Sequence, residues 1–181
     1  VVGMLAGIVG QMGVGDPFTE GVFMGPVINQ AACDRILGVI DSAKVSDGTL
    51  LTGGERLGGD LANGYFIAPT VFTEVDNSSS LAQNEVFGPV LAVIRFSDEE
   101  EAIRLANDTQ FGLAAYAHTN DLKRAHRVAA ALEAGSVWIN GSGLRVSTPF
   151  GGVKQSGFGR MGGRFGLEDF LQPKNVYIPL G

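Results

Sequence analysis

The spacing of apolar residues in the second half of the chain predicts strands that alternate with helices. Residues 90–96 form a nearly unbroken apolar run, which is typical of a strand buried on both faces. Residues 113–118 and 136–140 predict two further strands, and each gap between strands has the length of a helix. The resulting β-α-β-α-β order predicts an α/β fold with a parallel sheet and helices packed across it.

Polar residues at the ends of these helical stretches predict where the helices begin and end. Ser97 and Glu100 have the spacing of a capping box, which predicts that a helix begins at this point. Asn120 or Asp121 can cap the second helix, which we expect to run through Ala134 and to end with Gly135 at its C′ position.

The first half of the chain has two helical stretches and a short strand. Residues 1–12 are apolar and predict the end of a buried helix, closed by turn-forming residues at 13–17. Asn29 can cap the next helix, and its apolar residues share one helical face: Ala32, Ile36, Leu37 and Ile40. Residues 49–52 predict a short strand that ends at two glycines.

Proline marks two stretches that predict edge strands. Pro69 interrupts the β-rich residues 65–75, so an edge or bulged strand is expected there rather than a central one. The last strand, 175–178, is isolated between Pro173 and Pro179. Its unpaired edge could bind another chain or domain.

Composition excludes several classes of protein. The 181 residues are 45% hydrophobic with a net charge of −6, which fits a globular domain and argues against a nucleic-acid-binding surface. No run reaches the roughly 20 apolar residues that cross a bilayer. A single cysteine, Cys33, allows no internal disulfide, so we expect a cytoplasmic location.

The start of the chain indicates a fragment. Residues 1–12 lack the basic region of a signal peptide, contain three glycines and do not begin with methionine. We therefore expect that Val1 is an internal residue of a longer protein.

Three stretches together resemble the C-terminal half of the aldehyde dehydrogenase superfamily: EVFGPV at 85–90, ANDTQFGLAA at 106–115 and PFGGVKQSGFGR at 149–160. The resemblance covers residues 13 to 178 and implies an NAD(P)-dependent oxidoreductase that acts on an aldehyde. It also implies a division into the C-terminal portion of the catalytic domain, 1–170, and an oligomerisation strand or tail, 171–181. The expected partners are the remainder of its own polypeptide and identical subunits, as a homodimer or homotetramer.

Glu85 and Phe87 are the candidate cofactor-binding residues. Gly88 and Pro89 predict a rigid turn that holds both on a defined loop before the strand at 90–96. A carboxylate can accept two hydrogen bonds from a ribose diol. The pattern alone favours a solvated glutamate and a core phenylalanine, whereas the resemblance implies that Glu85 binds the nicotinamide ribose of NAD or NADP beside Phe87. Asn84 departs from the family, where many members have a second glutamate.

Phe150 is the candidate substrate-binding residue. The resemblance implies that Phe150 lines the aldehyde tunnel; the alternative is that it fills the core below its loop. The preceding segment, 141–148, corresponds to the loop that shapes substrate preference in the family. Here it contains Arg145, which either favours an acidic aldehyde or faces water.

Five other residues carry weaker predictions. We expect Lys154 and Arg160 to fix their loop through backbone or carboxylate groups. The resemblance places Arg35 near the adenosine end of the cofactor. His118 and His126 have no nearby cysteines, so no metal site is expected.

The chemistry of the family requires a thiolate, which attacks the aldehyde to give a thiohemiacetal and, after hydride transfer to NAD(P)+, a thioester. The resemblance places this cysteine about fifteen residues before Val1, with the general base further upstream, so no catalytic residue is expected in this chain. Cys33 lies in an amphipathic helix without a neighbouring histidine, which predicts a structural role. Two alternatives remain: a non-catalytic interaction module, and part of a CoA-acylating enzyme.

Overall fold

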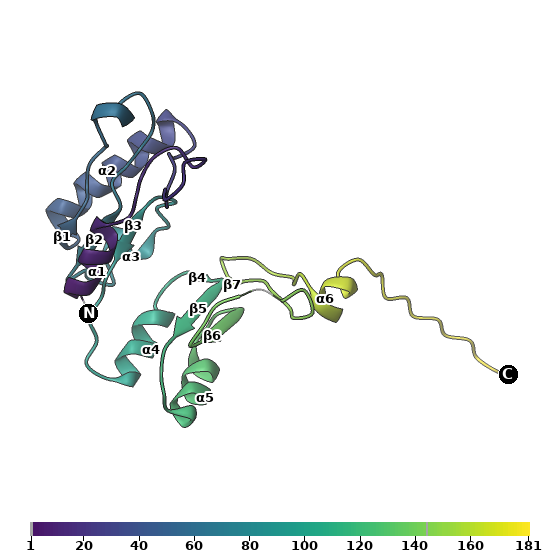
Figure 1. The fold of residues 1–181 in the computed structure, drawn as a ribbon. Coiled ribbons are helices and arrows are strands. Elements are labelled where there is room, and N and C mark those ends of the chain that lie inside the picture. Colours follow the sequence, from purple (N-terminus) through teal and green to yellow (C-terminus); the bar gives the residue numbers. More distant parts are fainter. Residues whose placement is uncertain (1, 144) are drawn as a thin grey trace. The chain divides into compact units, whose positions relative to one another are not determined.

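The computed structural model describes residues 2–143 and 145–181. The chain forms two compact units, Val1–Phe96 and Ser97–Gly181, each with its own strands and helices (Figure 1). Among the described residues, no helix has the length and apolar character needed to cross a membrane. The mixture of helices with parallel strand pairs confirms the predicted α/β fold class.

The first unit is built on a three-stranded sheet. Its strands are ordered β1 (Thr49–Thr52), β2 (Thr70–Thr73) and β3 (Val90–Ala92). β2 pairs antiparallel with β1 and parallel with β3. The helical elements of this unit are α1 (Val2–Gly10), α2 (Gln30–Ser46), the 3-10 turn η1 (Gly59–Leu61) and α3 (Ser80–Gln83).

The core of the first unit forms between α2 and β2. Asn29 caps α2 as predicted, because its side-chain oxygen accepts a hydrogen bond from the amide of Ala32 at 2.9 Å. The buried face of α2 then packs with the fully buried Phe72 of β2. The α2 residues with no exposed surface are Cys33, Ile36, Ile40 and Ala43.

Three predictions for this unit were wrong in part. β2 is the central strand and not an edge strand, because Pro69 lies just before it and leaves its hydrogen-bond ladder intact. The alternative of a bulge agrees with the pairing of β1 with β2, whose register shifts between Leu50 and Thr52. The strand predicted at 90–96 is limited to β3 at the sheet edge, and Leu91 is 46% exposed, so it is not buried on both faces. The apolar helix α1 forms, but Val9 is its only buried residue among those described.

The described residues of the second unit form two small pairs of strands and three helices. β5 (Ala114–Ala117) pairs parallel with β6 (Ser136–Ile139), and β4 (Phe111–Gly112) pairs antiparallel with β7 (Val153–Lys154). The helices are α4 (Glu99–Asn107), α5 (Leu122–Ala131) and α6 (Gly163–Glu168). The parallel β5–α5–β6 unit was predicted, although β3 pairs with β2 rather than in one ladder with β5 and β6.

The helix ends differ from their prediction by short shifts. Asp98, not Ser97, caps α4, and the carboxylate of Glu101 reaches back to the amide and hydroxyl of Ser97. Asp121 caps α5, as one of the two predicted residues. α5 ends at Ala131, so Gly135 is not its C′ residue; Gly135 instead lies closely against the backbone of Gly151.

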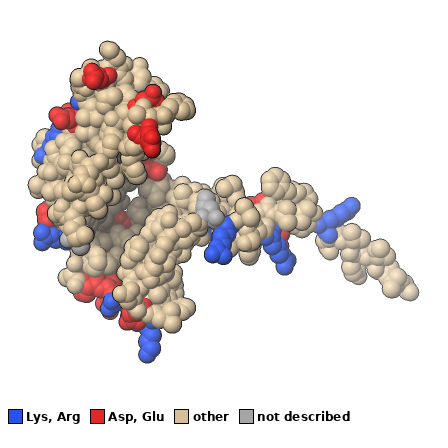
Figure 2. Space-filling view, in the orientation of Figure 1, with Lys and Arg blue, Asp and Glu red and all other residues tan. Residues whose placement is uncertain are grey.

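An ion cluster joins α4 to α5. Glu99 accepts hydrogen bonds from Arg124 at 2.9 Å and from Arg127 at 2.9 Å. The hydrogen bond from Arg127, helped by Arg124, lowers the pKa of Glu99 from 4.5 to about 2. Acidic and basic side chains are intermixed over this part of the molecule (Figure 2).

The C-terminal residues 171–181 form no strand and are exposed throughout. The edge strand predicted at 175–178 is therefore absent from this chain, because no described residue provides the ladder that a strand requires. The division of function at 170/171 stays a prediction.

Candidate functional site

The loop that precedes β3 is anchored to α2 at two points. The guanidinium of Arg35 donates a hydrogen bond to the carbonyl oxygen of Val86 at 2.7 Å. The side chain of Val86 packs against the core. Gly88 lies so close to Ile36 that a Cβ atom at this position would be 2.7 Å from its Cδ1 atom. The backbone at 86–88 is consequently held in a fixed position.

Anchoring of Val86 turns its two neighbours outward. Glu85 is exposed, and no described residue hydrogen-bonds its carboxylate. Phe87 is 76% exposed, which contradicts the core alternative, and its φ of +49° is uncommon for a bulky residue. Strained residues of this kind persist where the surrounding structure holds them, and they cluster at ligand-binding positions.

These observations fit the binding of a ribose diol and an adjacent aromatic ring. The Glu85 carboxylate offers two unpaired acceptor oxygens, and the neighbouring Phe87 offers an apolar ring open to a ligand. The role of both residues stays a prediction. Arg35, expected near the adenosine end, bonds the backbone of this same loop.

The second candidate region is a cavity of about 570 Å³ in the second unit. It is lined by β6, the loop that follows β6, and Phe150. Phe150 is half-buried and exchanges two backbone hydrogen bonds of 2.7 Å with Met161, which fix its position. Its ring lies 6.5 Å from that of Trp138, which stacks on Tyr116 at 5.0 Å. Phe150 thus contributes to an aromatic wall of this cavity, and its role in an aldehyde tunnel stays a prediction.

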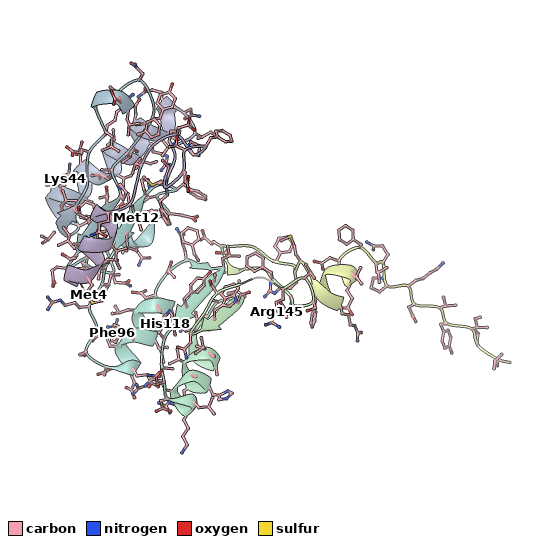
Figure 3. All side chains as sticks on the ribbon, viewed as in Figure 1. Met4, Met12, Lys44, Phe96, His118 and Arg145 are labelled. Atoms are coloured by element: carbon pink, nitrogen blue, oxygen red, sulfur yellow. The ribbon has the colours of Figure 1, made fainter. Side chains whose placement is uncertain are left out.

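The loop after β6 carries Arg145 at the cavity (Figure 3). Trp138 contacts this loop by donating a hydrogen bond from Nε1 to the carbonyl of Gly143 at 2.8 Å. Thr148 donates from its hydroxyl to the carbonyl of Arg145 at 2.9 Å. The Arg145 side chain has no hydrogen bond or ion pair with any described residue.

Lys154 and Arg160 have the structural contacts that were predicted. The Lys154 ammonium donates to the carbonyls of Asn107 at 2.6 Å and Thr109 at 3.2 Å, and it pairs with Glu133 at 2.7 Å. Arg160 donates to the carbonyls of Gly152 and Gly159 within its own loop. Both side chains therefore fix the chain around β7.

Cys33 is fully buried in the core of the first unit, which agrees with a structural role. His118 follows β5, and His126 lies on α5. Within residues 2–143 and 145–181, no three side chains of the types that bind metals come together.

Comparison with known proteins decides the family. The model of the aldehyde dehydrogenase family matches residues 1–176 of this chain. The chain belongs to the aldehyde dehydrogenase family. The stretches at 85–90, 106–115 and 149–160 thus indicated the correct family.

The most similar relatives include a betaine aldehyde dehydrogenase from Cereibacter sphaeroides, 48% identical over 93% of this chain and 34% of its own length. Aminoaldehyde dehydrogenase 1 of Pisum sativum is 48% identical over 90% of this chain and 32% of its own length. This aldehyde dehydrogenase chain therefore spans about one third of the length of these relatives.

Two solved structures show the same likeness in three dimensions. Betaine aldehyde dehydrogenase from Staphylococcus aureus in complex with NAD+ superimposes with a TM-score of 0.90 at 42% identity, over 93% of this chain and 34% of its own. The Mycobacterium tuberculosis aldehyde dehydrogenase complexed with NAD+ gives 0.94 at 38% identity, over 99% and 37%. Both likenesses extend over nearly the whole of this aldehyde dehydrogenase chain.

Sequence reasoning missed two features of the site. The Arg35–Val86 bond was not foreseen, because a contact between residues 51 positions apart has no local signal. The Trp138–Tyr116 stack was not foreseen either, although parallel pairing of β5 with β6 places these residues opposite each other. A register assignment for the two predicted strands could have found it.

Proposed function

We propose that this chain is the downstream portion of the catalytic domain of an NAD(P)-dependent aldehyde dehydrogenase that oxidises an aldehyde to a carboxylic acid. The observation that carries the proposal is the anchored loop before β3, which presents Glu85 and Phe87 outward on a backbone fixed by Arg35. Family membership and the NAD+ complexes of two structural neighbours support the same assignment.

In this proposal, Glu85 accepts hydrogen bonds from the hydroxyls of the nicotinamide ribose, and Phe87 packs beside that ring. Both side chains are exposed and Phe87 has a left-handed backbone before the cofactor binds, so little ordering is needed on binding. When bound, NAD(P)+ accepts the hydride from the aldehyde carbon. Phe150 borders the path of the aldehyde with Trp138 at its side.

The nucleophile of the reaction comes from outside this chain. The only thiol here, Cys33, has no exposed surface and packs among apolar side chains of α2 and β2. A thiolate must reach the aldehyde carbon to attack it, and a side chain without exposed surface cannot make that approach. The chain therefore contributes binding and orientation, and not bond formation, to the parent enzyme.

We also propose that residues 175–178 become a strand when identical subunits assemble into a homodimer or homotetramer. Val176, Tyr177 and Ile178 are 67%, 83% and 72% exposed, which is a large apolar surface for a tail. Their backbone belongs to no helix or strand of the described chain, so the edge of a neighbouring sheet could pair with it.

The test is the Glu85→Gln variant of the full-length protein, with Glu20→Gln as the matched control. Glu20 is an exposed loop glutamate of the same unit. Loss of charge-assisted hydrogen bonds should lower kcat/KM for NAD(P)+ by about 10- to 100-fold, while Glu20→Gln stays near the unmodified protein. Equal values for all three proteins would contradict the proposed contact.

A further inference from the structure

The charge at the cavity beside Phe150 comes from a single described residue. Among the described residues that line it, Arg145 carries the only charge, and no carboxylate faces it. The carbonyl of Arg145 accepts a hydrogen bond from the Thr148 hydroxyl, and the carbonyl of Gly143 accepts one from Trp138. The guanidinium is therefore an unpaired cation at a cavity whose other described lining residues are apolar or carry hydroxyl groups.

From this arrangement we infer that Arg145 selects aldehydes that carry a carboxylate at the end remote from the aldehyde group. The inference rests on the proposed function, since the cavity must belong to the substrate path. A guanidinium presents two parallel N–H donors that match the two oxygens of a carboxylate. Ser142 and Thr148 line the same cavity and offer hydroxyl donors beside it.

The aromatic wall argues against the opposite preference, for a cationic aldehyde. A quaternary ammonium group is bound by open faces of aromatic rings. One face of Trp138 is covered by Tyr116, which stacks on it with an interplanar angle of 13°, and Phe150 is tilted against the same ring system at 43°. The stack thus leaves one face of Trp138 for a cation, and the charge of Arg145 in the same lining repels a positive substrate.

The experiment compares three aldehydes with the full-length protein: succinic semialdehyde as the anion, butanal as the neutral molecule with the same carbon chain, and betaine aldehyde as the cation. The variants are Arg145→Gln, Arg145→Glu and the control Arg164→Gln, whose side chain is 87% exposed on α6 and does not line the cavity. The readout is the ratio of kcat/KM values between aldehydes, so a general loss of activity cancels.

The unmodified protein should prefer succinic semialdehyde over butanal, and Arg145→Gln should lower that ratio by about 10- to 100-fold. Arg145→Glu should lower it further and raise the ratio of betaine aldehyde to butanal, whereas Arg164→Gln should change neither. An unchanged ratio in Arg145→Gln, or a preference of the unmodified protein for betaine aldehyde, would overturn the inference while the proposed oxidation stands. Absence of turnover with all three aldehydes would overturn the proposed function, and the inference with it.

Discussion

Adding one methyl group at either of two glycines of the first unit should have opposite effects on stability. In Gly88→Ala, the new Cβ would lie 2.7, 2.9 and 3.0 Å from three carbon atoms of Ile36, which is fully buried and cannot move freely. Overpacking of this kind costs about 1–3 kcal/mol. The lower entropy of the unfolded alanine chain returns about 0.4–1 kcal/mol. We expect a net loss of up to about 2.6 kcal/mol.

Gly38→Ala is the matched control within α2. A Cβ atom added at Gly38 would have no neighbouring atom within 4 Å, and the residue is in the interior of a helix. Alanine is favoured over glycine there by about 1 kcal/mol, so this variant should be more stable than the unmodified chain.

Hydrogen exchange of the α2 amides, resolved by mass spectrometry, measures both effects within the unit that contains them. Protection should fall in Gly88→Ala and rise in Gly38→Ala. If the α2 amides are as well protected in Gly88→Ala as in Gly38→Ala, the tight contact between Gly88 and Ile36 is wrong.

Three further predictions concern charge and burial. The Arg127 hydrogen bond lowers the pKa of Glu99 to about 2. The stability that the ionised Glu99 carboxylate contributes is therefore complete above about pH 4.5 and is lost as the pH falls toward 2. Glu99→Gln should flatten this part of the pH dependence of unfolding, measured by Trp138 fluorescence. Lys154→Met should destabilise the second unit by about 1–3 kcal/mol in urea unfolding, because two carbonyls and Glu133 lose their partner; an unchanged midpoint would refute this. Cys33→Ala should leave turnover of the full-length protein nearly unchanged, and a collapse of turnover with the fold intact would make Cys33 more than structural.

Local patterns in the sequence predicted most elements and the residues that cap them. Asn29 and Asp121 were recognisable because capping depends on a few neighbouring residues. Asp98 was missed in favour of Ser97, since both can cap and only the backbone geometry decides between them. The end of α5 at Ala131 was missed because no glycine or proline marks it.

Long-range pairing was less predictable than local structure. The position of β2 in the centre of its sheet depends on β1 and β3, and Pro69 alone suggested an edge. The burial expected for 90–96 depends on what covers β3, which periodicity cannot show. The strand predicted at 175–178 requires a partner that the described chain does not supply.

The same limit applies to the site. The family stretches pointed to Glu85, Phe87 and Phe150, but the reason that Glu85 and Phe87 face outward lies in the bond from Arg35 and the packing of Val86. These contacts connect separate segments and become visible only in the folded unit.

The most direct test of the central claim is NADH formation by residues 1–181 alone, mixed with an aldehyde and NAD+. The chain should produce no NADH, because it supplies the proposed cofactor contact while its only thiol is buried in a core. Turnover that disappears in Cys33→Ala would contradict the account, since it would place the nucleophile within this chain.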